Sequence, residues 1–157
     1  MSELLQLTFW ATFLSAAVRT AIPILCASIG EDISEKAGII NVGLEAVMLV
    51  GAFFGFAAAY LTHSLFWGFV VGMLAGMLLS LLHAFLSVYL KQDQNVAGVA
   101  LNLLATGLTS YIFQLMVNRY GIPQIETLKS VPIPLLSKIP LIGDALFNKD
   151  IVVYFSY

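Results

Sequence analysis

Four polar side chains within apolar stretches are the residues of this sequence best placed to contact a solute: Asn41, Glu45, Asn102 and Thr106. Asn41 and Glu45 are four positions apart, as are Asn102 and Thr106, so each pair would share one face of a continuous helix. A charged group at the centre of a bilayer costs about 2.5–3.5 kcal/mol on insertion scales, unless it faces a cavity or a partner. The spacing therefore predicts a polar pathway wall that offers hydrogen bonds to a solute.

Each pair also has a structural interpretation. Asn41 and Glu45 are close enough to the polar segment 30–36 to stand at a helix end near the membrane interface. Asn102 and Thr106 could join helices through hydrogen bonds that are each worth well under about 2 kcal/mol. The sequence has no nucleophile elbow, glycine-rich phosphate loop or zinc motif. We therefore expect a chain that is not an enzyme and holds no metal or cofactor of its own.

The composition indicates that lipid, and not water, surrounds most of the chain. Of its 157 residues 60% are hydrophobic and 10% are charged, whereas soluble domains carry about 25% charged residues. The net charge of -2 includes no basic run, so nucleic acid is not expected as a partner. Cys26 is the single cysteine, which excludes a disulfide within the chain.

The apolar runs predict an all-α, polytopic transmembrane helical bundle, because each approaches the roughly 20 residues that a span needs. The expected spans are 4–29, 37–61, 65–90 and 96–117, followed by a loop at 118–150 and the start of another span at 151–157. Residues 1–157 would then form a single transmembrane domain that is cut short.

The first apolar run allows two interpretations. Either all of residues 4–29 span, or residues 4–18 lie at the interface with Arg19 and the span is 20–29, with Pro23 in its first turns. The second interpretation requires a broken helix near residues 30–38. Transporters tend to place binding sites at discontinuous helices. The charges leave the membrane orientation open, since the positive-inside rule is weak for long loops.

Glycines at four-residue spacing indicate where helices approach closely. Gly51 and Gly55 share a face in the second run, and Gly68, Gly72 and Gly76 share one in the third. Small residues at this spacing let transmembrane helix backbones meet. We expect these five glycines to serve helix packing.

Several segments resemble one known family. GEDISEKAGIINVGLE at 30–45, continuing as AVMLVGAF at 46–53, resembles the signature segment of permease subunits in ATP-binding-cassette (ABC) importers for nucleosides, the group partnered with basic-membrane-protein-type lipoproteins. NVAGVALNLL at 95–104 and IPLIGDALF at 139–147 are similar to that family too. The group is more distantly similar to ribose-type sugar permeases, whose helix break lies beside the translocation path.

This resemblance implies a multi-pass protein of the bacterial inner membrane that translocates a nucleoside or a related small polar solute. The implied partners are an ABC ATPase subunit that carries ATP and Mg, a second permease subunit and an extracytoplasmic substrate-binding lipoprotein. Family members are roughly twice this length, which implies an N-terminal portion. A simple-sugar permease is the alternative, and a structural or assembly membrane protein is the alternative of another class.

Overall fold

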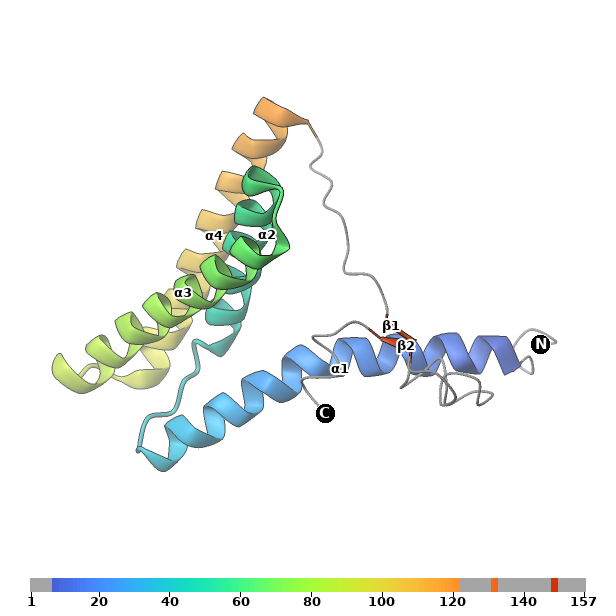
Figure 1. The fold of residues 1–157 in the computed structure, drawn as a ribbon. Helices are drawn as coiled ribbons and strands as arrows, with labels where there is room; N and C mark the ends of the chain where they lie inside the picture. The colour runs from blue at the N-terminus through green and yellow to red at the C-terminus, as the bar shows by residue number, and fades with distance from the viewer. Residues whose placement is uncertain (1–6, 122–130, 133–147, 150–157) are drawn as a thin grey trace. The chain divides into compact units, whose positions relative to one another are not determined.

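The computed structural model describes residues 7–121, 131–132 and 148–149 of the chain. The elements in order are α1 (Leu7–Lys36), α2 (Leu44–Thr62), α3 (Leu65–Ala84), the π-helix η2 (Phe85–Tyr89), α4 (Gln94–Tyr120), β1 (Val131–Pro132) and β2 (Asn148–Lys149) (Figure 1). The two short strands pair antiparallel. The chain divides into two compact units, residues 1–28 with 127–157 and residues 29–126, and each is described by itself.

The predicted all-α membrane fold is confirmed. Within the described residues, the helices long and apolar enough to cross a membrane are Thr12–Lys36, Leu44–Thr62, Leu65–Tyr89 and Gln94–Tyr120. The predicted span 37–61 begins seven residues too early, because α2 starts at Leu44, whereas the predicted spans 65–90 and 96–117 lie within three residues of the observed ends. The predicted span start at 151–157 and most of the predicted loop 118–150 lie outside the described residues.

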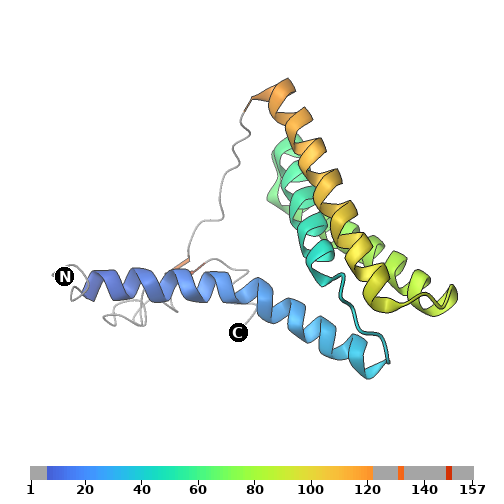
Figure 2. The same ribbon diagram turned by 180° about the vertical axis from the view of Figure 1, so that it is seen from behind.

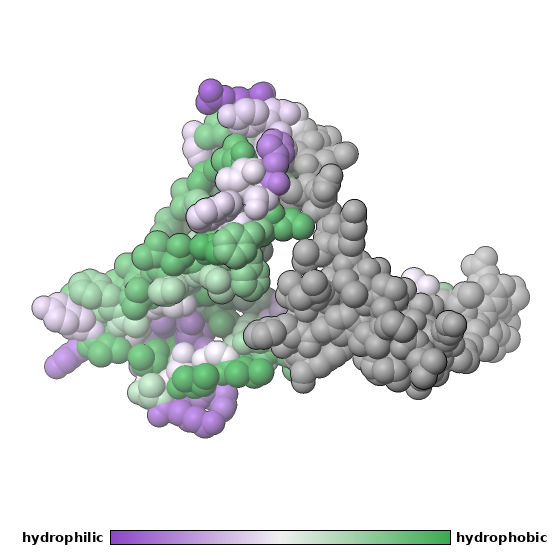
Figure 3. All heavy atoms as spheres, viewed as in Figure 1, coloured by the Kyte–Doolittle hydropathy of each residue, from purple (hydrophilic) through white to green (hydrophobic). Residues whose placement is uncertain are grey.

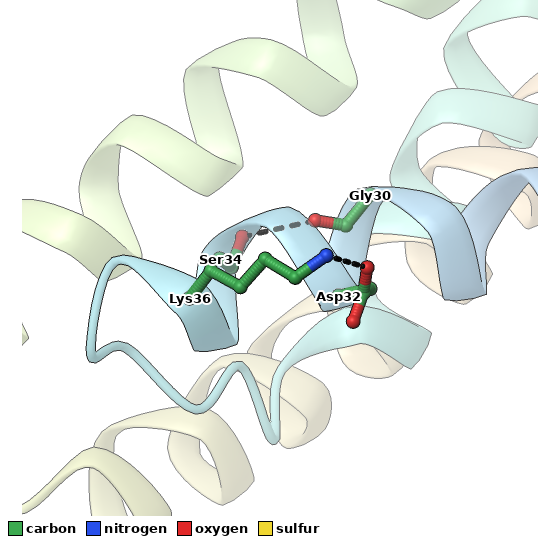
Figure 4. A network of polar contacts seen from close by, with 4 residues as sticks. All are labelled: Gly30, Asp32, Ser34 and Lys36. Carbon is green, nitrogen blue, oxygen red and sulfur yellow. Dashed lines mark hydrogen bonds and ion pairs between the residues drawn. The ribbon is translucent and has the colours of Figure 1, made fainter.

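The predicted helix break lies later than expected. Helix α1 continues through the polar segment to Lys36, and the non-helical residues are 37–43, which we name the helix break. Side chains four residues apart support the last turns of α1: Lys36 Nζ lies 2.6 Å from Asp32 Oδ2, and the Ser34 hydroxyl donates to the Gly30 carbonyl (Figure 4). Gly38 follows with φ +84°, a left-handed conformation that ends helices.

Helix α1 also runs without interruption through Arg19 and Pro23. Pro23 therefore lies inside the helix and not in the first turns of a separate span, which removes that argument for a span limited to residues 20–29. A span-length apolar stretch extends from Thr12 to the end of α1.

Helices α2, α3 and α4 lie side by side in the second unit (Figures 1 and 2). Tight turns make this possible, because His63 and Lys91 adopt left-handed backbone conformations between α2 and α3 and before α4. A small core joins α2 to α4 through Ala46, Val50, Leu101 and Ala105. Phe54, Ala75, Leu79 and Leu86 pack against it.

The outer surface of these helices is strongly apolar. Large side chains such as Phe66, Leu78 and Leu103 are about two-thirds exposed or more. In Figure 3 the visible face of the helices is mostly hydrophobic, and hydrophilic residues gather toward the helix ends. Exposed apolar area on this scale is typical of a surface that contacts lipid or further transmembrane helices.

Candidate functional site: a helix break held by α4

The predicted packing glycines lie where α2 meets α3. A Cβ added to Gly68 would lie 2.8 Å from the carbonyl oxygen of Gly55, and one added to Gly72 would lie 2.9 Å from that of Gly51. Gly76 is buried, but its nearest neighbour would be the Val47 side chain at 3.5 Å. The two backbones therefore approach closely at Gly51, Gly55, Gly68 and Gly72, with the Ala59 methyl group packed against Gly68.

Part of the backbone of the helix break is paired by side chains from α1 and α4, and the amides of residues 37–39 bind backbone carbonyl groups in the last turns of α1. Gln94 Oε1 accepts from the Ile40 amide at 2.7 Å, and Gln94 Nε2 donates to the Gly38 carbonyl at 3.5 Å. Glu31 Oε1, on α1, accepts from the Asn41 amide at 2.7 Å. The two side chains thus fix the backbone of the break at Gly38, Ile40 and Asn41.

Asn102 completes this arrangement at the beginning of α2. Its Oδ1 accepts from the Ala46 amide at 2.8 Å, and its Nδ2 donates to the Val42 carbonyl at 3.2 Å. The residue that precedes α2 is Gly43, which has no side chain to cap the helix. Asn102 therefore performs from α4 the task that a Ser, Asp or Asn at the cap position ordinarily performs.

Gly98 brings α4 close enough for these hydrogen bonds to form. A Cβ added there would lie 2.7 Å from the Gly43 nitrogen and 2.8 Å from Val42 Cβ. Gln94, Gly98 and Asn102 are successively four residues apart on α4, so they share one face. We name these three residues the α4 clamp.

The structure separates Asn41 from Glu45. Because α2 begins at Leu44, the two residues are not on one continuous helix, and the condition for a shared helical face fails. Asn41 lies in the helix break, where its Oδ1 is buried without a hydrogen-bond partner among the described residues. Glu45 is exposed in the first turn of α2, where the positive end of the helix dipole favours an acidic side chain.

Asn102 and Thr106 both lie on α4, four residues apart, but their side chains make different contacts. The Thr106 hydroxyl is exposed and donates to the backbone carbonyl of Asn102 at 2.8 Å. Asn102 is half-buried, and its amide group binds the Val42 carbonyl in the helix break and the Ala46 amide in α2. Whether any of the four predicted residues lines a solute pathway stays a prediction.

Two residues of this site, Glu31 and Gly98, were not predicted from the sequence, and Gln94 was not among the predicted pathway residues. The available signal was the spacing of Gln94, Gly98 and Asn102, which places an amide, a glycine and an amide on one helical face. Glu31 has no such signal, since it contacts a backbone amide across the turn that follows α1. Its second oxygen, Oε2, is buried without a partner within the described residues. No group of three or more His, Cys, Asp or Glu side chains that could hold a metal occurs in the same part of the chain.

Residues 13–139 match the family described as "Branched-chain amino acid transport system / permease component". The chain is 41% identical to TsgC13 of Haloferax volcanii, an ABC transporter permease protein named provisionally for glucose, over 94% of this chain and 45% of that protein. It is 33% identical to the guanosine ABC transporter permease protein NupQ of Bacillus subtilis over 93% of this chain and 46% of NupQ. It is 38% identical to the nucleoside ABC transporter permease protein NupC of Lactococcus lactis over 81% of this chain and 42% of NupC.

The chain spans somewhat less than half the length of these curated relatives. No solved structure matches it significantly. The family match covers most of the chain, including α2, α3, α4 and the helix break, and it agrees with the four apolar helices of a multi-pass membrane protein. The chain belongs to the family of ABC-type permease components described for branched-chain amino acid transport systems.

Proposed function

We propose that the chain forms part of the translocation pathway of an ABC importer in the bacterial inner membrane and moves a nucleoside or a related small polar solute. The observation that carries this proposal is the helix break, held by polar side chains among helices that are otherwise apolar. Such breaks expose backbone and polar groups beside transporter pathways. Two of the three relatives reported above are named for nucleosides or guanosine, which favours that solute class.

The partners follow from the same proposal. The complete permease would pair with a second permease subunit, receive its solute from an extracytoplasmic binding lipoprotein, and contact an ATPase subunit that binds ATP and Mg. This chain would itself break no bond: its contribution is a change of conformation that opens the pathway to one side and then to the other.

A simple sugar is the second candidate solute, because the chain is 41% identical over 152 residues to the relative named for glucose. Uptake by the complete permease, reconstituted with its ATPase and binding protein in liposomes, separates the two candidates. We expect ATP-dependent uptake of labelled guanosine that unlabelled nucleosides suppress and that glucose and ribose leave unchanged. Suppression by sugars alone would replace the nucleoside with a sugar. If no ATPase is recovered when the complete protein is purified, the structural or assembly class is favoured.

Glu45 is the predicted pathway residue whose replacement tests the site most directly. We expect Glu45→Leu to abolish uptake and to leave membrane insertion intact, because the carboxylate at the exposed beginning of α2 would no longer be available to a polar solute. Glu45→Gln is the matched control for polarity without charge. Unchanged uptake by Glu45→Leu, at normal abundance in the membrane, would remove Glu45 from the pathway.

A further inference from the structure

The α4 clamp contacts both ends of the helix break at once. Gln94 pairs with Gly38 and Ile40 near its beginning, and Asn102, eight residues further along α4, pairs with Val42 and with Ala46 in α2. The two amides are fixed on one continuous helix. A displacement of α4 away from the break would therefore break all four hydrogen bonds together.

We propose that Gln94 and Asn102 are positioning residues that latch the helix break, so that movement of α4 releases the beginning of α2 as the pathway opens. This inference rests on the proposed function, since it assigns a moving part to the same site. Neither residue needs to touch the solute. Both act through the backbone of residues 38–46, whose conformation sets where the Asn41 and Glu45 side chains lie.

Two features make the latch reversible. Each clamp amide offers a donor and an acceptor, and water or a polar solute group can replace both when α4 withdraws. Gly38 supplies a point of rotation on the α1 side, because its φ of +84° is readily adopted only by glycine, no atom lies within 4 Å of where a Cβ would stand, and its amide remains paired with the Glu35 carbonyl of α1. Hinges of this kind absorb a conformational change in a few residues at the end of an element.

Gly98 determines how firmly the latch closes. It is buried against Gly43 and Val42, with no room for a Cβ. Between the two amides, α4 and the break are thus in backbone contact. The latch is closed in this structure, and its release requires α4 to separate from the break along its N-terminal half.

The test uses the complete permease with its ATPase and binding protein in liposomes, and compares Asn102→Leu, Asn102→Asp and Gln94→Leu with wild type. Asn102→Asp keeps the acceptor for the Ala46 amide and loses the donor to Val42. Asn95→Ala is the matched control, because Asn95 has an exposed amide side chain in the same turn of α4 as Gln94. Two readouts are needed: solute transported per ATP hydrolysed, and hydrogen exchange of the amides in residues 38–47.

We expect Asn102→Leu to speed exchange in residues 38–47 about tenfold, as loss of hydrogen bonds worth about 1.4 kcal/mol would do. Transport per ATP should fall by a similar factor, since the beginning of α2 would no longer be held in place until α4 moves. Gln94→Leu should have a smaller effect, and Asn102→Asp should lie between Asn102→Leu and wild type. Asn95→Ala should match wild type in both readouts.

The latch proposal would be overturned if Asn102→Leu left the hydrogen exchange of residues 38–47 unchanged. It would also be overturned if transport per ATP stayed at the wild-type value. Failure of both Asn102 variants to accumulate in the membrane would also overturn it, because the contact would then be needed only for folding. The proposed function fails separately, if wild-type permease takes up no solute with ATP. Hydrogen exchange still tests the clamp in that case.

Discussion

The α2–α3 contact and the contact of α4 with the helix break are both close approaches of backbone, yet they are built from different chemistry. Between α2 and α3, glycines bring carbonyl groups against the facing helix, and no polar side chain takes part. Between α4 and the break, Gly98 allows the approach and two amide side chains bind the backbone on either side of it. Contacts of the first kind depend on shape alone, while contacts of the second kind can be exchanged for water or solute. We therefore expect the α2–α3 pair to stay rigid and the helix break to move.

The largest effect is expected where the contact depends on shape alone. In Gly68→Ala the new Cβ would meet Ala59 Cβ at 2.7 Å and the Gly55 carbonyl oxygen at 2.8 Å. Neither atom belongs to a flexible side chain, so the helices must separate. We expect a loss of about 3 kcal/mol in the free energy of unfolding, in the upper range for overpacking, measured by denaturant titration of the purified full-length permease in detergent.

Gly76→Ala is the matched control for that substitution. It adds the same methyl group on the same face of α3, but the nearest neighbour is Val47 Cγ1 at 3.5 Å, an ordinary contact. Its unfolding free energy should equal that of wild type or rise slightly, because alanine favours helix more than glycine by up to about 1 kcal/mol. Equal losses in the two variants would mean that close approach does not govern the α2–α3 contact.

Sequence reasoning accounted for the helices and for the spacing of the glycines, but not for the clamp. The long apolar runs predict spans because span length and hydropathy are local properties. The position of the break is not local: polar residues 30–36 continue α1, and the chain leaves the helix only where Gly38 turns and where Gln94, 56 residues later, binds its carbonyl. The spacing of Gln94, Gly98 and Asn102 places them on one helical face, but it does not reveal which distant backbone groups the two amides bind. Asn102 is therefore recognisable from the sequence as a polar residue within an apolar run, but its role as a cap for α2 depends on a contact between residues 56 positions apart.

A smaller effect on stability is expected at Gly98. A Cβ in Gly98→Ala would meet the Gly43 nitrogen at 2.7 Å, but here one partner is the non-helical break, which can shift more readily than a helix. We expect about 1–2 kcal/mol of destabilisation, together with faster hydrogen exchange in residues 38–47. Gly107→Ala is its control on the same helix, with no atom within 4 Å of the added Cβ. A loss of stability as large as that of Gly68→Ala would remove the contrast between a rigid and a movable contact.

The smallest effect is expected at Glu31, whose carboxylate holds the break from the α1 side. Glu31→Leu removes the acceptor of the Asn41 amide and should cost about 1 kcal/mol, the usual value for one hydrogen bond. Glu31→Gln keeps a side-chain oxygen at the same distance from the backbone, so its loss of unfolding free energy should be less than half that of Glu31→Leu. The unfolding free energies of the two variants, measured under the conditions used for the glycine variants, check this order. If Glu31→Gln were as destabilising as Glu31→Leu, the negative charge and not the hydrogen bond would be what the break requires, and the buried second oxygen of Glu31 would need a cationic partner from another part of the assembly.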